Sequence, residues 1–129
     1  MRPFDNLRLT AMLLALAPVV ALAHHPRATF DHARPVVVDG VVSEFRWTSP
    51  HAWLYVDVPR DAAAGGAQRW VLEGTSLAVM VRNGWKSGSL RPGDRVRVLV
   101  APRRDGAPGG EFISVTLTES GKVLRLSPN

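Results

Sequence analysis

The stretch VVVDGVVSEFRW, which occupies residues 36–47, is the part of the sequence that decides the fold. Most of its residues are β-branched or aromatic, and these residue types are enriched in strands. Gly40 interrupts the run near its centre, where a glycine typically marks a bulge or a sharp bend. We therefore predict one long first strand that bends at Gly40. Thr48-Ser49-Pro50 follows with residues typical of a turn.

Further segments continue this β pattern towards the C-terminus. Residues 52–58 (AWLYVDV) alternate, so that successive side chains point to opposite faces of a strand. One face holds Ala52, Leu54, Val56 and Val58, and the other holds Trp53, Tyr55 and Asp57. The other predicted strands cover residues 68–73, 95–100 and 111–118, with a short last strand over residues 122–126.

A short helix is predicted between the third and fourth strands, over residues 77–83 (LAVMVRN). Thr75 or Ser76 can cap its start, and Gly84 can end it in a left-handed conformation. In such a helix Leu77, Met80 and Val81 would face the core. Val79 and Val81 also suit a strand, which keeps that alternative open.

The order of three strands, a short helix and two or three further strands indicates a mainly β domain. It matches the OB-fold, a small antiparallel Greek-key barrel of five strands, here with a sixth appended. Another small antiparallel barrel or sandwich is the alternative. We place the barrel domain in residues 36–129 and an N-terminal arm in residues 24–35, which has no periodicity and two prolines.

Residues 1–23 are typical of a cleaved secretory signal peptide. Arg2 and Arg8 provide a positive n-region, residues 9–22 are nearly all apolar, and Ala21-Leu22-Ala23 is a small-x-small cleavage site. The apolar run is shorter than the roughly 20 residues that cross a bilayer, so an uncleaved membrane helix is the weaker alternative. We expect a periplasmic or secreted protein with no membrane anchor after cleavage.

The chain contains no cysteine, which excludes disulfides, thiolate catalysis and cysteine metal sites. Its formal net charge of +5 is mild and favours anionic partners only weakly. Export also argues against nucleic acid as the natural partner, although OB-folds often bind it.

Six motifs carry a resemblance to a known family: Phe30-Asp31, residues 40–47 (GVVSEFRW), Ser49-Pro50-His51, residues 70–74 (WVLEG), Gly84-Trp85 and residues 90–94 (LRPGD). In this combination the chain resembles a family of small exported bacterial proteins classified only as a domain of unknown function. The resemblance covers residues 24–126. Ser49 stands where the family usually has Asn, and both residues suit a turn. The resemblance implies no activity.

The four histidines are the sharpest chemical feature, and all lie in the first half of the chain. Cleavage after Ala23 would make His24 the N-terminus, whose amine and imidazole can chelate Cu(II) together. His25, His32 or His51 could supply a further nitrogen. Cleavage one residue earlier would place His25 third in the mature chain, which is another copper arrangement. The alternative is an exposed arm without metal, with His51 hydrogen-bonded in its turn.

Aromatic and arginine side chains on the predicted strands form a second candidate site. Strands 2 and 3 of an OB-fold carry the usual ligand face. The candidates for that face are Arg46, Trp53, Tyr55, Arg69 and Arg97. Trp47, Trp70 and Trp85 are expected in the core instead.

No recognised catalytic motif is present, and Glu73 at the end of the third strand is the one carboxylate that stands out. We therefore expect a non-enzymatic binding or accessory module for a protein or glycan. A copper-binding protein built on His24 is the alternative, and a copper-dependent redox enzyme is a third possibility.

Overall fold

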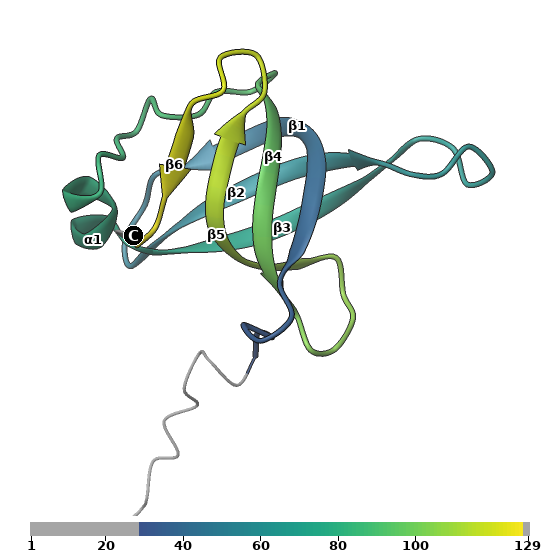
Figure 1. The fold of residues 1–129 in the computed structure, drawn as a ribbon, viewed down its shortest axis with the longest axis horizontal. Coiled ribbons are helices and arrows are strands. Elements are labelled where there is room, and N and C mark those ends of the chain that lie inside the picture. Colours follow the sequence, from purple (N-terminus) through teal and green to yellow (C-terminus); the bar gives the residue numbers. More distant parts are fainter. Residues whose placement is uncertain (1–28, 128–129) are drawn as a thin grey trace, which may run out of the picture.

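The computed structural model of the chain describes residues 29–127, which form six strands and one short helix (Figure 1). The strands are β1 (Val36–Arg46), β2 (His51–Pro59), β3 (Ala67–Ser76), β4 (Arg95–Pro102), β5 (Gly109–Leu117) and β6 (Val123–Arg125), and helix α1 is Leu77–Arg82. Each predicted element is present, with ends that differ from the prediction by at most three residues. The predicted signal peptide lies outside the described residues.

The strands close into a barrel through one parallel contact. The sheet runs in the order β3-β2-β1-β4-β5-β6, and each strand is hydrogen-bonded to the next one in this order as an antiparallel pair. In addition, residues 71–73 of β3 pair in parallel with residues 109–111 of β5. This contact closes β1 to β5 into a five-stranded barrel, with β6 added to β5 and α1 between β3 and β4. The OB-like fold class is confirmed.

The core fills the barrel because alternate residues of each strand point inward. In β2 the predicted inner residues Ala52, Leu54 and Val56 are fully buried, while Trp53 and Tyr55 remain partly exposed. The valines of β4 repeat the pattern: Val96, Val98 and Val100 are buried, and Arg95 and Arg97 are exposed. The two-residue period of the sequence therefore decides which side of the wall each residue occupies.

The prediction that the first strand is irregular at Gly40 is wrong in its position. Gly40 pairs regularly with Val96, and the irregularity against β2 lies between Val42 and Glu44. Gly40 is required for a different reason: a Cβ atom there would lie 2.6 Å from the Asp57 carbonyl oxygen and 2.6 Å from a methyl group of Val56. The glycine therefore permits a close approach of β1 and β2.

Helix α1 and the segment after it seal one end of the barrel, which we call the closed end. Ser76 caps the helix by accepting a hydrogen bond from the Val79 amide, and Met80 is fully buried. The expectation that Val81 faces the core was wrong, since 59% of it is exposed. This six-residue helix buries only a narrow stripe, for which Leu77 and Met80 suffice.

Trp85 completes the closed end. Its ring is 2% exposed and lies 5.9 Å from the Phe45 ring and 5.6 Å from the Phe112 ring, measured between centroids. The indole Nε1 donates to the carbonyl oxygen of Arg125 at 2.8 Å. Asn83 Nδ2 likewise donates to the Leu126 carbonyl at 2.6 Å. These bonds tie the segment of β6 to the helix.

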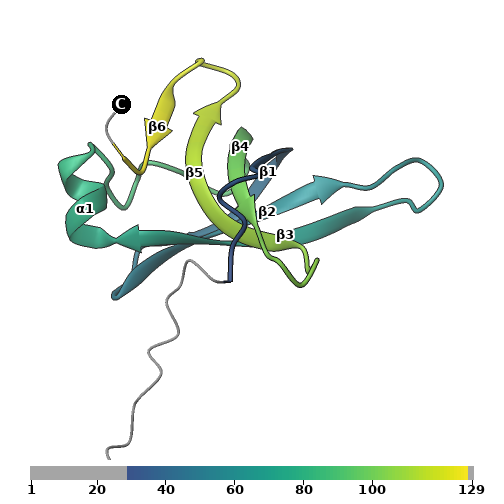
Figure 2. The ribbon, with the colours of Figure 1, turned by 60° about the horizontal axis from the view of Figure 1, so that its bottom comes forward.

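The end of the predicted arm is part of the folded structure. Phe30 forms an isolated antiparallel bridge with Arg103, and the Asp31 amide donates to the Pro102 carbonyl at 2.8 Å. Figure 2 shows this segment running beside the barrel, while the β2–β3 hairpin extends away from it. Within residues 29–127, no helix has the length and apolar character needed to cross a membrane.

Candidate functional site

Three strands present a continuous outer wall, formed by the outward-facing residues of β1, β2 and β3. Strand register aligns these residues in rows. Arg46, Trp53 and Glu73 form one row, since Arg46 pairs with Trp53 and Trp53 with Glu73. Other rows hold Glu44, Tyr55 and Val71, and Asp57 beside Arg69. We use "outer wall" for these eight residues.

Charged side chains on the outer wall are held in place by their neighbours. The guanidinium of Arg46 lies 5.2 Å from the centre of the Tyr55 ring and is bonded to Glu44 at 3.0 Å. Arg69 Nε donates to Asp57 at 2.9 Å, and this hydrogen bond raises the pKa of Arg69 above its usual value. Stacked and paired arginines present fixed donors beside the aromatic rings.

Arg97 is the one predicted face residue that lies elsewhere. It projects from β4 and bonds Asp39 on the first half of β1 at 2.8 Å. This hydrogen bond lowers the pKa of Asp39 below its usual value, outweighing the opposing effect of partial burial. The structure thus gathers Arg46, Trp53, Tyr55 and Arg69 on the outer wall and leaves Arg97 apart.

The outer wall ends in a recess of about 390 Å³, which we call the Trp53 recess. Its lining includes Phe30, Trp53, Val71, Glu73, Arg103 and Pro108. The docked arm forms one side of it, and the loop between β4 and β5 forms another. The bridge of Phe30 to Arg103 brings these two segments together. The sequence alone does not predict this cavity, because the cavity depends on where the arm attaches to the barrel.

His51 and Glu73 form a pair beside the Trp53 recess. His51 Nδ1 lies 2.6 Å from Glu73 Oε1, and both side chains are partly buried. The sequence points to the two residues separately, to His51 as a candidate metal ligand and to Glu73 as the carboxylate that stands out. They meet because the start of β2 lies against the end of β3, where the register is irregular between His51 and Trp53.

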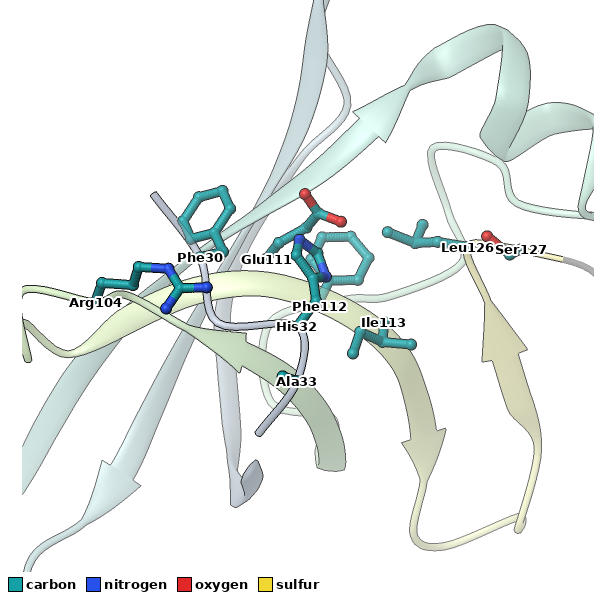
Figure 3. A pocket seen from close by; sticks show the side chains of 9 residues that line it. All are labelled: Phe30, His32, Ala33, Arg104, Glu111, Phe112, Ile113, Leu126 and Ser127. Carbon is teal, nitrogen blue, oxygen red and sulfur yellow. The ribbon is translucent and has the colours of Figure 1, made fainter. Parts of the chain in front are cut away.

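A second cavity of about 630 Å³ lies beyond the parallel contact between β3 and β5. We call it the His32 recess, and Figure 3 shows its lining. His32, Arg104 and Glu111 supply the polar groups, and Ile113 and Leu126 are among the apolar ones. Phe30 lines both recesses and therefore lies between them.

His32 and His51, the two histidines within residues 29–127, do not share a described metal site. Glu73, which holds His51, pairs in the parallel ladder with Glu111, which lines the His32 recess. His32 and His51 therefore stand near neighbouring carboxylates. Among residues 29–127, no three histidine, aspartate or glutamate side chains are placed to hold a metal ion. His24 and His25 lie outside the described residues.

Asp31 anchors the arm between the two recesses. Its carboxylate accepts hydrogen bonds from Arg34 Nε at 2.9 Å and from the Ala33 amide at 3.2 Å. Arg104 lies 3.7 Å away. Burial opposes ionisation of Asp31, but the hydrogen bond and charge of Arg34, with the charge of Arg104, together lower its pKa. The Phe-Asp motif is thus explained: Phe30 packs, and Asp31 fastens the chain beside it.

Comparison with known proteins identifies a family but no function. No curated protein and no solved structure matches the chain significantly. A family model described as "Family of unknown function (DUF6152)" matches residues 12–112. The match includes the docked arm, β1 to β4 and the start of β5, and therefore every residue of the outer wall. The chain belongs to this family of unknown function.

Proposed function

We propose that the protein is an exported, non-enzymatic binding module whose ligand surface is the outer wall. Residues 1–23 would be removed as a signal peptide, and the barrel would act in the periplasm or outside the cell. Sequencing the N-terminus of the protein from a periplasmic fraction tests the first part. A start at His24 is expected, and a retained Met1 would contradict it.

The observation that carries the proposal is the partial exposure of Trp53 and Tyr55 on adjoining rows of one wall. Their neighbours on the inner side of β2 are fully buried, so the core does not use these two rings. Aromatic side chains bury large areas on binding and dominate the energetics of interfaces. Arg46 and Arg69 flank them with fixed orientation. This combination supports a protein or glycan ligand.

Site-specific photocrosslinking in the native host tests the proposed surface. A photoreactive phenylalanine analogue replaces Tyr55 in one variant and Arg97, away from the outer wall, in the matched control. We expect a defined adduct from position 55 and at most a small fraction of it from position 97. Equal crosslinking from both positions, or none from position 55, would contradict the proposal.

Copper binding is a second candidate, favoured by the geometry of His51. Its Nδ1 faces Glu73, which leaves Nε2 for a metal. A carboxylate that holds the second nitrogen of a ligating histidine is typical of metal sites. Thr29, which lines the Trp53 recess with Glu73, follows His25 by four residues. An extended chain spans about 3.3–3.6 Å per residue, so the N-terminus could reach His51.

Titration of the mature protein with Cu(II), followed by calorimetry and paramagnetic resonance, tests this candidate. Binding should weaken at least tenfold when the N-terminal amine is acetylated, because one ligand is lost. The His51→Gln variant should also change the spectrum, whereas His32→Gln serves as the matched control. Weak binding that acetylation leaves unchanged would contradict a site built on His24.

A further inference from the structure

We infer that the Trp53 recess binds the cationic side chain of a partner protein, a lysine or an arginine. The inference rests on the proposed binding function and assigns a ligand chemistry to one end of the outer wall. The shape of the recess, its charge and the ion pair of its arginine support this assignment.

The shape and lining of the recess suit a long side chain with an apolar stem. Trp53, Val71 and Pro108 provide apolar surface, and 38% of Val71 is exposed. Glu73 supplies a carboxylate in the same cavity. Lysine and arginine bury an aliphatic stem along apolar surface while the charged head finds a polar partner. A cavity with apolar walls and one carboxylate is complementary to that distribution.

Charge favours a cation at Glu73 over the other carboxylates of the outer wall. Glu44 and Asp57 are each held by an arginine, Arg46 and Arg69 respectively. Glu73 is held by a histidine instead, through a single oxygen, Oε1. An ionised carboxylate can accept several hydrogen bonds, so the capacity of Glu73 is not exhausted by this contact.

Trp53 lies next to Glu73 in the register of β2 and β3 and adds a second source of attraction. The face of an indole ring carries partial negative charge, and tryptophan is the strongest aromatic partner for ammonium and guanidinium groups. A cation in the recess would therefore meet an aromatic face and a carboxylate on adjacent strands. The overall positive charge of the chain makes this acidic position a local exception.

Arg103 lines the same recess and is the main objection to a cationic ligand. Its guanidinium is bonded through both Nε and Nη2 to the carboxylate of Asp105, with the Nε contact at 3.0 Å. The hydrogen bond from Arg103 lowers the pKa of Asp105 to about 2, so this carboxylate stays ionised and balances the charge. Arg103 is thus neutralised by its own loop, whereas Glu73 faces a histidine.

The test uses the mature protein and three probes. One is a short capped peptide with a single lysine between glycines, the second is the same peptide with Nε-acetyl-lysine, and the third is n-butylammonium. Binding is followed by the NMR shift of the Trp53 indole Nε1–H. We expect the lysine peptide to bind at least tenfold more tightly than the acetylated peptide. It should also bind more tightly than n-butylammonium, since a protein ligand gains backbone contacts with the wall.

Two variants and one control locate the site. Glu73→Gln keeps an acceptor for His51 but removes the charge, and it should weaken the lysine peptide at least fivefold. Trp53→Leu should weaken it as well, and because this variant has no Trp53 indole, its binding is followed by the backbone amides of Val71 and Glu73 in the same recess. Glu119→Gln, an exposed glutamate in the turn between β5 and β6 and outside the outer wall, should leave the affinity unchanged. Amide spectra of all three variants must match those of the parent, which separates a lost contact from a lost fold.

Several results would overturn the inference. These are equal affinity for both peptides, an equal loss in Glu119→Gln, or a Trp53 shift caused by acetate, which would identify an anion site at Arg103. Binding of n-butylammonium as tight as that of the peptide would contradict a protein side chain as the ligand. If the peptide fails while the crosslink at position 55 persists, the inference falls and the proposed binding surface stands.

Discussion

Trp85 and Trp53 mark two regions that use the same side chain in opposite ways. At the closed end, Trp85 is almost completely buried, contacts two phenylalanines and donates its indole hydrogen to a backbone carbonyl. At the Trp53 recess, Trp53 stays partly exposed on an outward-facing row beside Glu73. The core of the barrel therefore includes Trp85 but not Trp53, whose ring is available to contact a ligand.

The largest expected effect is on stability at the closed end. Trp85→Ala should lower the free energy of unfolding by about 3–5 kcal/mol, the usual cost of truncating a large aromatic residue in a core. Trp53→Ala is the matched control and should cost well under half of that. Denaturant unfolding of both variants measures the difference. Equal losses of unfolding free energy in the two variants would contradict the conclusion that Trp85 stabilises the core and Trp53 does not.

Truncation of Phe30 tests the border between the two recesses. Phe30→Ala should lower the free energy of unfolding by about 3 kcal/mol or less, which is less than Trp85→Ala. The reason is that Phe30 packs on one side of the barrel and is attached by a short segment. Hydrogen exchange should accelerate first at the Asp31 amide, which bonds Pro102. Uniform acceleration across β1 to β5 would show instead that Phe30 belongs to the global core.

A smaller effect isolates the indole hydrogen bond of the closed end. Trp85→Phe keeps an aromatic ring but leaves the Arg125 carbonyl without its donor. The loss of one such partly buried bond costs about 0.5–1.5 kcal/mol. Unfolding measurements on Trp85→Phe and Trp85→Ala together separate the bond from the packing. A Phe variant as stable as the parent would mean that water replaces the indole.

The smallest effect concerns acid stability at the anchor of the arm. The pKa of Asp31 is lowered in the folded state, so its ionised form stabilises the fold above its ordinary unfolded value of 3.8. This stabilisation is lost as the pH falls from that value through the lowered pKa. Asp31→Asn should therefore be less stable at pH 7 and show a weaker loss between pH 4 and pH 2. An unchanged pH profile would contradict this role.

Most of the fold could be predicted from the two-residue alternation of apolar and polar side chains within single strands. The alternation of Ala52 to Val58 and of Arg95 to Val100 depends on neighbouring residues alone, so both strands and their inner faces were predicted correctly. The bulge beyond Val42 was misplaced to Gly40, because a glycine can serve either a bulge or a close approach. The choice depends on the strand that packs alongside, which the local sequence does not specify.

The site was harder to predict because it is assembled from distant segments. The sequence predicts one ligand face from Arg46, Trp53, Tyr55, Arg69 and Arg97, since strands 2 and 3 of an OB-fold usually carry it. The first four lie on the outer wall and Arg97 lies on β4. The pairing of His51 with Glu73 depends on an irregular register, and the Trp53 recess depends on where Phe30 attaches. Neither feature leaves a periodic signal. The candidate histidines His24 and His25 stay a prediction.

The bridge between Phe30 and Arg103 has a consequence for the order of events in folding. Its two residues are 73 positions apart, and the parallel contact of β3 with β5 joins segments 38 positions apart. Pairings of such long separation form slowly compared with local hairpins. The Trp53 recess exists only once these long-range pairings have formed, so a partner that needs it can recognise only a folded chain.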